Sequence, residues 1–419
     1  MITSVRLINF KNFADETLRV GPFTVIVGAN ASGKSNIRDA FRFLHGIGRG
    51  YRLADIMGGQ YGAGGQDDWA GIRGAMNEII RFGQSSFSIQ VNVEEFTYTI
   101  EVGRDETGDR AFRVTKEELK FGWRTIYTSH PGPGDPVHDQ GDDIHLFLRM
   151  EKTRTQRKYG DRLMVRPDQP ALTQIQERKN VLREHKKAAE RVTQVLANMR
   201  FLELEPQRMR EPAFPGQTVL GDGGERLPTA LRAICEDSQR KETLAAWLRE
   251  LTPMDVEDFE FPTDPSGRVQ LVLREANGRR VSAYAASDGT LRFLAMLAAL
   301  LGPNPNRLYF FEEIDNGIHA ARQWLLLELI EKQTAKRGIQ VVTTTHSPDL
   351  LTMMNVSSFI NASVVCRLED AGDAIIRPIA ELPRAGELRT SQGLGDLLSS
   401  GWMEDALAFT EGYGEEVGK

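Results

Sequence analysis

The sequence predicts an α/β fold in which three buried strands end in residues suited to chemistry. The first strand is the apolar segment 23–27, FTVIV, which leads into a glycine-rich turn and then a helical period. The second is 308–311, LYFF, which is too apolar for a strand with one face in water. The third lies within 339–351, IQVVTTTHSPDLL, and ends at a histidine. Buried strands that alternate with helices indicate the α/β class.

Length and composition limit the kinds of protein that this sequence can encode. Its 419 residues suffice for one large domain with insertions or for two domains, and its 40% hydrophobic and 26% charged residues are ordinary for a globular protein. A net charge of −6 argues against a uniformly basic surface but allows a local basic groove. Cys235 and Cys366 match no metal spacing. Because we find no signal-peptide core and no apolar run of about 20 residues, we expect a cytoplasmic protein without a membrane partner.

The first buried strand leads into a phosphate-binding motif. Residues 28–35, GANASGKS, have the pattern G-x-x-x-x-G-K-S, and apolar residues then recur at helical spacing. Glycines let backbone N–H groups turn inward around phosphate oxygens, and the start of a helix favours an anion. Lys34 is expected to reach the β- and γ-phosphates, and the hydroxyl of Ser35 is expected to bind Mg²⁺. The motif predicts a site for ATP and Mg²⁺.

Two adjacent acids follow the second buried strand. Glu312 and Glu313 stand where a P-loop NTPase has a magnesium ligand and the residue that polarises the attacking water. We expect Glu312 to hold Mg²⁺ and Glu313 to act on the water. The alternative is a strand that runs into an acid-capped helix, which is a common arrangement. The phosphate-binding motif elsewhere in the chain favours the first interpretation.

Two further elements flank these acids. Upstream, Ser287-Asp288-Gly289 precedes an apolar helix, so that hydroxyl and N–H groups would form an anion site at a helix start. Downstream, the third buried strand ends at His346. Alone, the first element is a good helix cap and the second a structural histidine. The long interval between Lys34 and Glu312, however, excludes the usual Ras-like and AAA+ cores and favours a class that inserts a signature motif there.

With these elements in this order, the chain resembles the RecF/SMC/OLD branch of ABC-type ATPases. The resemblance covers roughly residues 1–100 and 200–400, and it is strongest to short predicted AAA-family ATPases without a long coiled coil, such as the ATPase subunits of the antiphage systems Septu and PARIS. It implies a two-lobed P-loop NTPase fold with N-terminal antiparallel strands and a helical insertion. It also implies ATP and Mg²⁺ as cofactors and a homodimer around two ATP molecules, or a higher oligomer.

The resemblance assigns a role to individual residues. EEIDNGIHA parallels a family motif, with 316–319 as the D-loop and Ile314 in place of the usual proline. Gln207 is our choice for the Q-loop, with Gln60, Gln66 and Gln84 as weaker candidates. The implied nucleotide-binding residues are Lys11, Asn12, Gly28, Asn30, Ser32, Gly33, Lys34, Ser35, Asn36, Gln207, Ser287, Asp288 and Gly289. The implied metal ligands are Ser35, Gln207 and Glu312, and the implied catalytic residues are Glu313 and His346.

The remaining sequence predicts three parts of one composite domain. Residues 1–104 hold the N-terminal part of the core, 105–200 an insertion or lid, and 201–419 the C-terminal part. Clean alternation in 85–103 and a turn at Asn277-Gly278 in 269–284 predict two antiparallel hairpins.

The segment 150–200 differs from a bare ATPase. Residues 150–167 are basic, and 171–200 is expected to be helical because Ile175, Leu182, Ala189 and Leu196 recur every seven residues. The basic residues of the first part are Lys152, Arg154, Arg157, Lys158, Arg162 and Arg166. The segment is either a basic lid that contacts DNA, RNA or a partner subunit, or a solvated helix whose acids balance its bases.

Two functional hypotheses remain. In the first, ATP-driven dimerisation of an ATPase controls a separate effector, a nuclease, in antiphage defence or DNA metabolism. In the second, the protein acts on DNA itself, as an OLD-like nuclease or a RecF-like repair ATPase. A nuclease of that kind needs a D-x-D pair for Mg²⁺, whereas the C-terminal segment offers Asp370 and Asp373 without that spacing. We therefore favour the first hypothesis.

Overall fold

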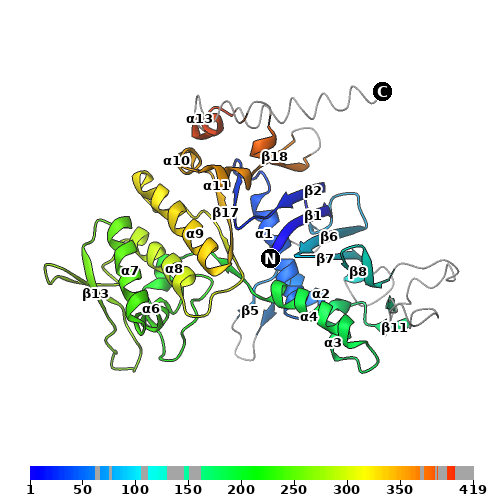
Figure 1. The fold of residues 1–419 in the computed structure, drawn as a ribbon, viewed down its shortest axis with the longest axis horizontal. Coiled ribbons are helices and arrows are strands. Elements are labelled where there is room, and N and C mark those ends of the chain that lie inside the picture. The colour runs from blue at the N-terminus through cyan, green and yellow to red at the C-terminus, as the bar shows by residue number, and fades with distance from the viewer. Residues whose placement is uncertain are drawn as a thin grey trace. The chain divides into compact units, whose positions relative to one another are not determined.

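The computed structural model describes residues 1–61, 67–74, 78–104, 112–129, 146–150, 162–368, 372–382, 385 and 394–401. The chain forms two compact units, each built from discontinuous segments (Figure 1). Unit 1 comprises 1–21, 28–199 and 363–378, and unit 2 comprises 22–27, 200–362 and 379–419. The predicted α/β fold with a P-loop lobe and N-terminal antiparallel strands is confirmed.

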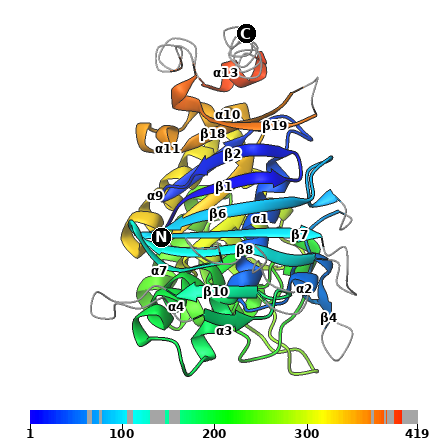
Figure 2. The ribbon, with the colours of Figure 1, turned by 90° about the vertical axis from the view of Figure 1, so that its right-hand side faces the viewer.

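Unit 1 contains an eight-stranded sheet in the order β11-β10-β9-β8-β7-β6-β1-β2. Figure 2 shows β2, β1, β6, β7 and β8 lying side by side in this order. The predicted hairpin over 85–103 is β6 and β7, in which buried and half-buried residues alternate along β6. The strands are β1 (Ile2–Phe10), β2 (Phe13–Arg19), β6 (Ser86–Val93), β7 (Phe96–Arg104), β8 (Phe112–Phe121), β9 (Arg124–Thr128), β10 (Leu146–Met150) and β11 (Arg162–Val165).

Helices and two small strand pairs complete unit 1. Helix α1 (Lys34–Gly48) packs on the sheet through Phe43, whose ring lies edge-on to that of Phe87 with the two ring centroids 5.4 Å apart. Helix α1 also packs closely on α4, because a Cβ at Gly48 would lie 2.3 Å from the Ala197 nitrogen. The other elements are α2 (Leu53–Gly58), α3 (Ala171–Glu177), α4 (Arg183–Ala197), β4 (Gln60–Tyr61), β5 (Asp67–Trp69), β18 (Ala362–Arg367) and β19 (Ala374–Pro378).

The segment 171–200 is helical over most of its length, as predicted, but it is not one continuous helix. The chain forms α3 and α4 with a break between them, and Met199 already belongs to strand β12. Leu182, which the seven-residue spacing placed on the buried stripe, is 41% exposed and precedes the first residue of α4. The two helices pack on each other, and the other three residues of the period, Ile175, Ala189 and Leu196, are buried. Most of the basic segment, residues 151–161, lies outside the described residues.

A buried carboxylate joins α3 to the antiparallel sheet. Glu117 on β8 is 1% exposed and accepts hydrogen bonds from the hydroxyls of Tyr98 and Tyr127 at 3.0 and 2.9 Å. It also accepts the N–H groups of Ala171 and Leu172, at the start of α3, at 2.7 and 2.8 Å. Burial raises the pKa of Glu117, although these four donors oppose the shift.

We expect Glu117→Gln to lower the free energy of unfolding by about 2–4 kcal/mol, because an amide cannot accept all four donors. Glu118→Gln is the control, since among the described residues the Glu118 side chain pairs with Lys120, whose own side chain is exposed. The pKa of Glu117 is raised in the folded protein. The stability that this carboxyl contributes is therefore complete below its pKa of about 4.5 in the unfolded chain. It is lost as pH rises through the raised pKa of the folded state. Chemical denaturation should therefore show a larger difference from the parent at low pH, and equal effects of the two variants would contradict this role.

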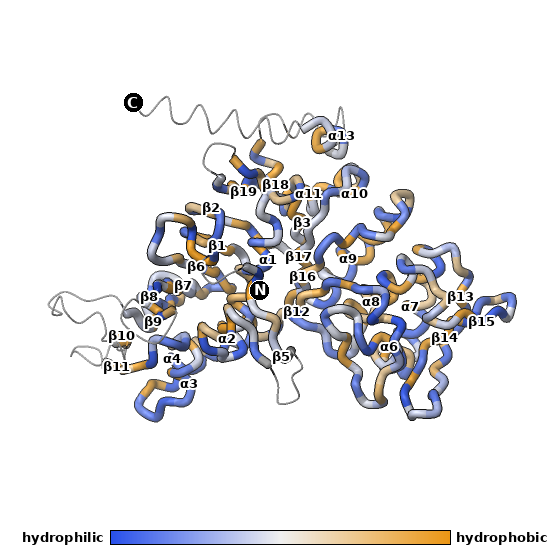
Figure 3. Tube along the Cα trace, turned by 180° about the vertical axis from the view of Figure 1, so that it is seen from behind, coloured by the Kyte–Doolittle hydropathy of each residue, from blue (hydrophilic) through white to orange (hydrophobic). Residues whose placement is uncertain are grey.

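Unit 2 is built on the strands β12-β16-β17-β3. Their residues are β3 (Phe23–Val27), β12 (Met199–Leu202), β16 (Leu308–Phe311) and β17 (Gln340–Thr345). Every residue of β3, β16 and β17 is buried, as their apolar sequences predict. Helix α9 (Gln323–Arg337) packs on β17 and β3, and α8 (Asp288–Leu301) packs on α9. Helix α8 is apolar nearly all round, whereas α9 mixes hydrophobic and hydrophilic residues (Figure 3).

The rest of unit 2 is helical with one small sheet. The predicted hairpin over 269–284 is β14 (Val272–Glu275) and β15 (Arg280–Ser282), which pair with β13 (Val256–Glu260). Its turn is the predicted one, because Gly278 has φ +83°. The helices are α5 (Pro206–Met209), α6 (Leu227–Cys235), α7 (Ser238–Leu251), α10 (Pro348–Thr352), α11 (Val356–Ile360) and α13 (Leu394–Ser399), with short 3₁₀ turns at Ala320–Arg322 and Ile379–Glu381.

Two further expectations concern the division into domains and the absence of membrane-spanning helices. The three-part division at residues 104 and 200 stays a prediction, and the described part of 105–199 belongs to unit 1. Among the helices that the structure describes, none combines the length and the apolar character needed to cross a bilayer.

Candidate functional site

Parallel strands of unit 2 bring three strand ends to one edge of the sheet. Strand β17 pairs in parallel with β3 on one side and with β16 on the other. The carboxyl ends of parallel strands meet at the same edge. The residues that follow these ends in the chain are Gly28, His346 and Glu312. The three motifs found in the sequence therefore start from neighbouring strands of one sheet.

The loop after β3 has the shape of a phosphate cradle. Gly33 has φ +118°, and Lys34 begins helix α1. The Nζ of Lys34 donates to the carbonyls of Gly28 and Ala29 at 2.6 and 2.7 Å, so the ammonium lies across the loop. Ser32 is only 3% exposed, and its Oγ has no hydrogen-bond partner among the described residues. A buried hydroxyl, a cation and a helix start at one place fit a bound phosphate chain.

The N-terminal signature residues lie beside this loop. Asn36 donates to the side-chain oxygen of Asn12 at 2.7 Å, and the amide nitrogen of Asn12 lies 3.0 Å from where a Cβ on Gly33 would be. Lys11 forms an ion pair with Asp39 of α1 and donates to the carbonyl of Arg73 at 2.8 Å. Asn12 and Asn36 thus brace the loop, while the ammonium of Lys11 is engaged by Asp39. Asn30 on the loop and Ser35 in the first turn of α1 are exposed.

The paired acids differ in environment. The backbone N–H of Glu312 donates to the Leu202 carbonyl of β12 at 3.3 Å, and its Oε1 is buried. Glu313 has φ +48°, an uncommon value for a residue with a side chain, and its N–H donates to the hydroxyl of Thr344 at 3.1 Å. The carboxylate of Glu313 is 46% exposed and lies 3.8 Å from Nδ1 of His346. The structure therefore pairs the two residues that we predicted to be catalytic.

The signature and D-loop segments contact each other in unit 2. Ser287 caps α8, as predicted, because its Oγ accepts the N–H of Thr290 at 3.2 Å. A Cβ on Gly289 would lie 2.3 Å from the Gly317 carbonyl, so only glycine allows this approach. Arg210 donates to Asp288 at 2.7 Å and to the Ala286 carbonyl at 3.0 Å. No local pattern could have identified Arg210, because its partner Asp288 lies 78 residues further along the chain.

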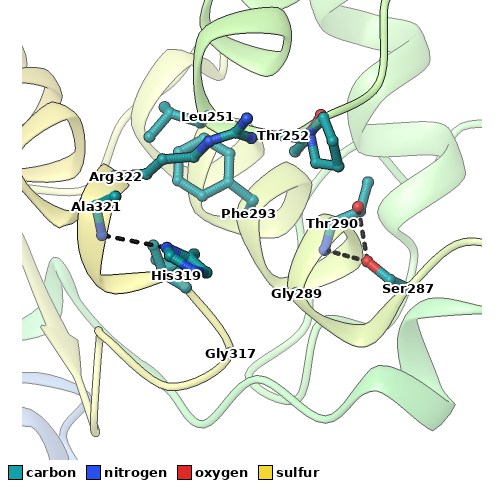
Figure 4. A pocket seen from close by; sticks show the side chains of 12 residues that line it. Leu251, Thr252, Ser287, Gly289, Thr290, Phe293, Gly317, His319, Ala321 and Arg322 are labelled. Carbon is teal, nitrogen blue, oxygen red and sulfur yellow. Dashed lines mark hydrogen bonds between the residues drawn. The ribbon is translucent and has the colours of Figure 1, made fainter.

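A pocket of about 450 Å³ lies between the start of α8 and the D-loop (Figure 4). Figure 4 shows the side chain of Arg322 crossing this pocket above the ring of Phe293, with His319 nearby. The pocket is lined by Leu251, Thr252, Pro253, Ser287, Gly289, Thr290, Phe293, Gly317, Ile318, His319, Ala321 and Arg322. Arg322 was not among the predicted site residues.

The Q-loop is the least defined part of the site. Gln207 is exposed in the short helix α5, five residues after the last residue of β12. Gln60 pairs with Trp69 in the ladder of β4 and β5, Gln84 is exposed, and Gln66 lies outside the described residues. The assignment of Gln207 stays a prediction.

The paired acids suit Mg²⁺ that is held partly by nucleotide and water better than they suit a metal held entirely by protein side chains. Across the described ranges, no three His, Cys, Asp or Glu side chains gather as a metal site. Mg²⁺ is usually bound by one or two carboxylates, water and substrate phosphates, which requires no such cluster. Glu312 and Ser35 each carry an oxygen of the kind that Mg²⁺ prefers. Of the two acids considered for a nuclease, Asp373 binds Arg81 at 2.8 and 2.6 Å, and Asp370 lies outside the described residues.

Comparisons with known proteins agree with these motifs. A family model described as "AAA domain, putative AbiEii toxin, Type IV TA system" matches residues 23–134 and 249–352, slightly more than half of the chain. No curated protein matches the chain.

Among solved structures, the chain is similar to heads of SMC proteins. The SMC head domain from Thermotoga maritima is 14% identical with a TM-score of 0.39, covering 90% of this chain and 98% of that one. An SMC head bound to the C-terminal winged-helix domain of ScpA is 15% identical with a TM-score of 0.45, covering 91% and 99%. The Pyrococcus furiosus SMC head with an extended coiled coil, bound to the C-terminal domain of ScpA, is 12% identical with a TM-score of 0.45, covering 93% and 98%.

Proposed function

Because this chain belongs to the AAA domain family described as putative AbiEii toxin, Type IV TA system, we propose that it is an ATPase that dimerises around ATP and switches a separate effector. The observation that carries the proposal is the parallel trio β3, β17 and β16, whose ends lead into the phosphate-binding loop, His346 and the paired acids. This arrangement provides a phosphate cradle, a metal ligand and a base from neighbouring strands.

The proposed chemistry assigns one task to each residue. Lys34 and the N–H groups of residues 28–35 hold the β- and γ-phosphates, and Ser35 and Glu312 hold Mg²⁺, which neutralises the charge that develops on the phosphates. Glu313 orients and polarises the attacking water. His346, 3.8 Å from Glu313, contacts the γ-phosphate.

The proposed dimer follows from the signature helix. Ser287 caps α8 and lies at the pocket beside the D-loop. In our proposal its hydroxyl and the first N–H groups of α8 bind the γ-phosphate of ATP held by a second copy, which gives a two-fold interface with two nucleotides. ADP lacks the γ-phosphate, so hydrolysis would weaken the dimer and provide the switch.

The effector belongs to the same proposal. We place the switch in antiphage defence or DNA metabolism, with a separate nuclease as the effector, on the basis of the resemblance to the ATPase subunits of Septu and PARIS. Copurification with the product of a neighbouring gene, followed by a nuclease assay with ATP or ADP, tests this part. Hydrolysis by the isolated chain tests the ATPase independently.

Dimerisation is tested by placing a large cation at the signature. In protein that also carries Glu313→Gln, to prevent turnover, we expect Ser287→Arg to bind ATP as a monomer and to form no dimer, because the new side chain fills the anion site. The measurement is the mass by light scattering with and without ATP. Ser266→Arg, at an exposed hairpin turn, is the matched control and should dimerise.

Two light-scattering results together would contradict the proposed dimer. If Glu313→Gln has the same mass with and without ATP, and Ser287→Arg changes nothing, the chain does not form an ATP-dependent dimer. The ATPase assignment would then depend on hydrolysis alone.

A further inference from the structure

The pocket beside the signature contains several hydrogen-bond donors, and none of its described lining residues is an acid. Its lining includes Arg322, His319 and Ser287, but no Asp or Glu. Nδ1 of His319 accepts the N–H of Ala321 at 3.3 Å, which leaves the proton of the neutral ring on Nε2, where it can donate. The first N–H groups of α8 have no partner within their helix. These groups together suit an anion.

Arg322 is the cation available in this pocket. Among the residues that the structure describes, none forms an ion pair with its guanidinium. The apolar side chains of Leu251, Phe293 and Ile318 line the same pocket. Apolar walls exclude water and strengthen the interaction of a guanidinium with an anion. Figure 4 shows the Arg322 side chain extending over Phe293 into this space rather than away from it.

The signature itself cannot supply this charge. Its second residue is Asp288, whose carboxylate would repel a phosphate. Arg210 engages that carboxylate at 2.7 Å and so offsets its charge. The Arg210–Asp288 pair carries no net charge, so a positive charge at the anion site has to come from a residue outside this pair. Arg322 lies in the same pocket as Ser287.

We infer that Arg322 contacts the terminal phosphate of ATP bound to a second copy of the chain, beside Ser287. The inference rests on the proposed function and adds a residue to it. Arg322 would make dimerisation depend on the γ-phosphate by pairing with a charge that ADP does not present there. It would act on the nucleotide of the partner and contribute nothing to ATP binding by its own P-loop.

The first test separates binding from assembly. In protein that carries Glu313→Gln, Arg322→Ala should bind ATP as a monomer within about twofold of its parent. The dissociation constant of the ATP-bound dimer should rise by about 10- to 100-fold, as expected for loss of a hydrogen bond between charged groups. Arg322→Lys should retain part of the effect. Arg279→Ala, at an exposed hairpin turn, is the matched control.

The second test shows on which copy Arg322 acts. Lys34→Ala and Arg322→Ala should each hydrolyse ATP poorly alone, but their mixture should regain activity, because one of the two sites in a mixed dimer is intact. A mixture of Lys34→Ala with Glu313→Gln should not recover, since both residues serve the nucleotide of one copy. Structural damage at Arg322 would not produce this recovery.

The outcomes distinguish the inference from the proposed function. If the parent dimerises with ATP and Arg322→Ala dimerises equally well, or if the mixture stays inactive, Arg322 has no role toward the second copy and only the inference fails. If the parent neither dimerises nor hydrolyses ATP, the proposed function fails and the inference fails with it.

Discussion

Glu313→Gln is expected to bind ATP like the parent and to lose at least ~10²-fold in the rate of hydrolysis, as for removal of a positioned base. The amide keeps the size of the side chain but cannot polarise water as the carboxylate does. The left-handed backbone at Glu313 and the bond from its N–H to Thr344 hold the residue at the strand end, and neither depends on the carboxylate. The change should therefore remove chemistry without altering the loop.

Phosphate release at saturating ATP measures this loss, and binding of a fluorescent ATP analogue measures affinity. Glu328→Gln is the control, because Glu328 makes only a surface ion pair with Lys332 on α9. Hydrolysis by Glu313→Gln at the rate of the parent would mean that the paired acids have been assigned wrongly.

Lys34→Ala is expected to abolish detectable ATP binding, and hydrolysis with it. The ammonium lies across the loop between the carbonyls of Gly28 and Ala29, where it would meet the β- and γ-phosphates. Its removal takes away the one positive side chain of the motif, so that within the loop only N–H dipoles oppose the phosphate charge.

Isothermal titration with ATP and Mg²⁺ gives the measurement, and the melting temperature shows whether the variant is folded. Lys332→Ala removes an exposed lysine of α9 that lies over Trp247, and it should bind ATP normally. Normal binding by a folded Lys34→Ala would exclude the phosphate-binding loop as the nucleotide site.

Patterns contained within short segments were predicted well from the sequence. The buried strands β3, β16 and β17, the hairpins β6–β7 and β14–β15, and the cap at Ser287 all follow from neighbouring residues. Each depends on hydrophobic periodicity or turn chemistry over a few positions, which the sequence displays directly. The order of the motifs then identified the fold class.

The helix over 171–200 shows where such reasoning fails. A seven-residue period fits one long helix as well as two helices that pack on each other across a turn, and only the position of the rest of unit 1 distinguishes them. Glu117 fixes the start of α3 by binding the N–H groups of Ala171 and Leu172 from a strand more than fifty residues earlier in the chain.

Short motifs in the sequence were enough to predict a role in the chemistry for the loop at 28–35, the acids Glu312 and Glu313, and the helix start at Ser287. Only the tertiary structure placed Glu313 beside His346, Arg210 on Asp288, and Arg322 in the pocket of Ser287. The physical reason is that a motif depends on the local backbone, whereas a contact between residues distant in the chain depends on how the strands and helices pack.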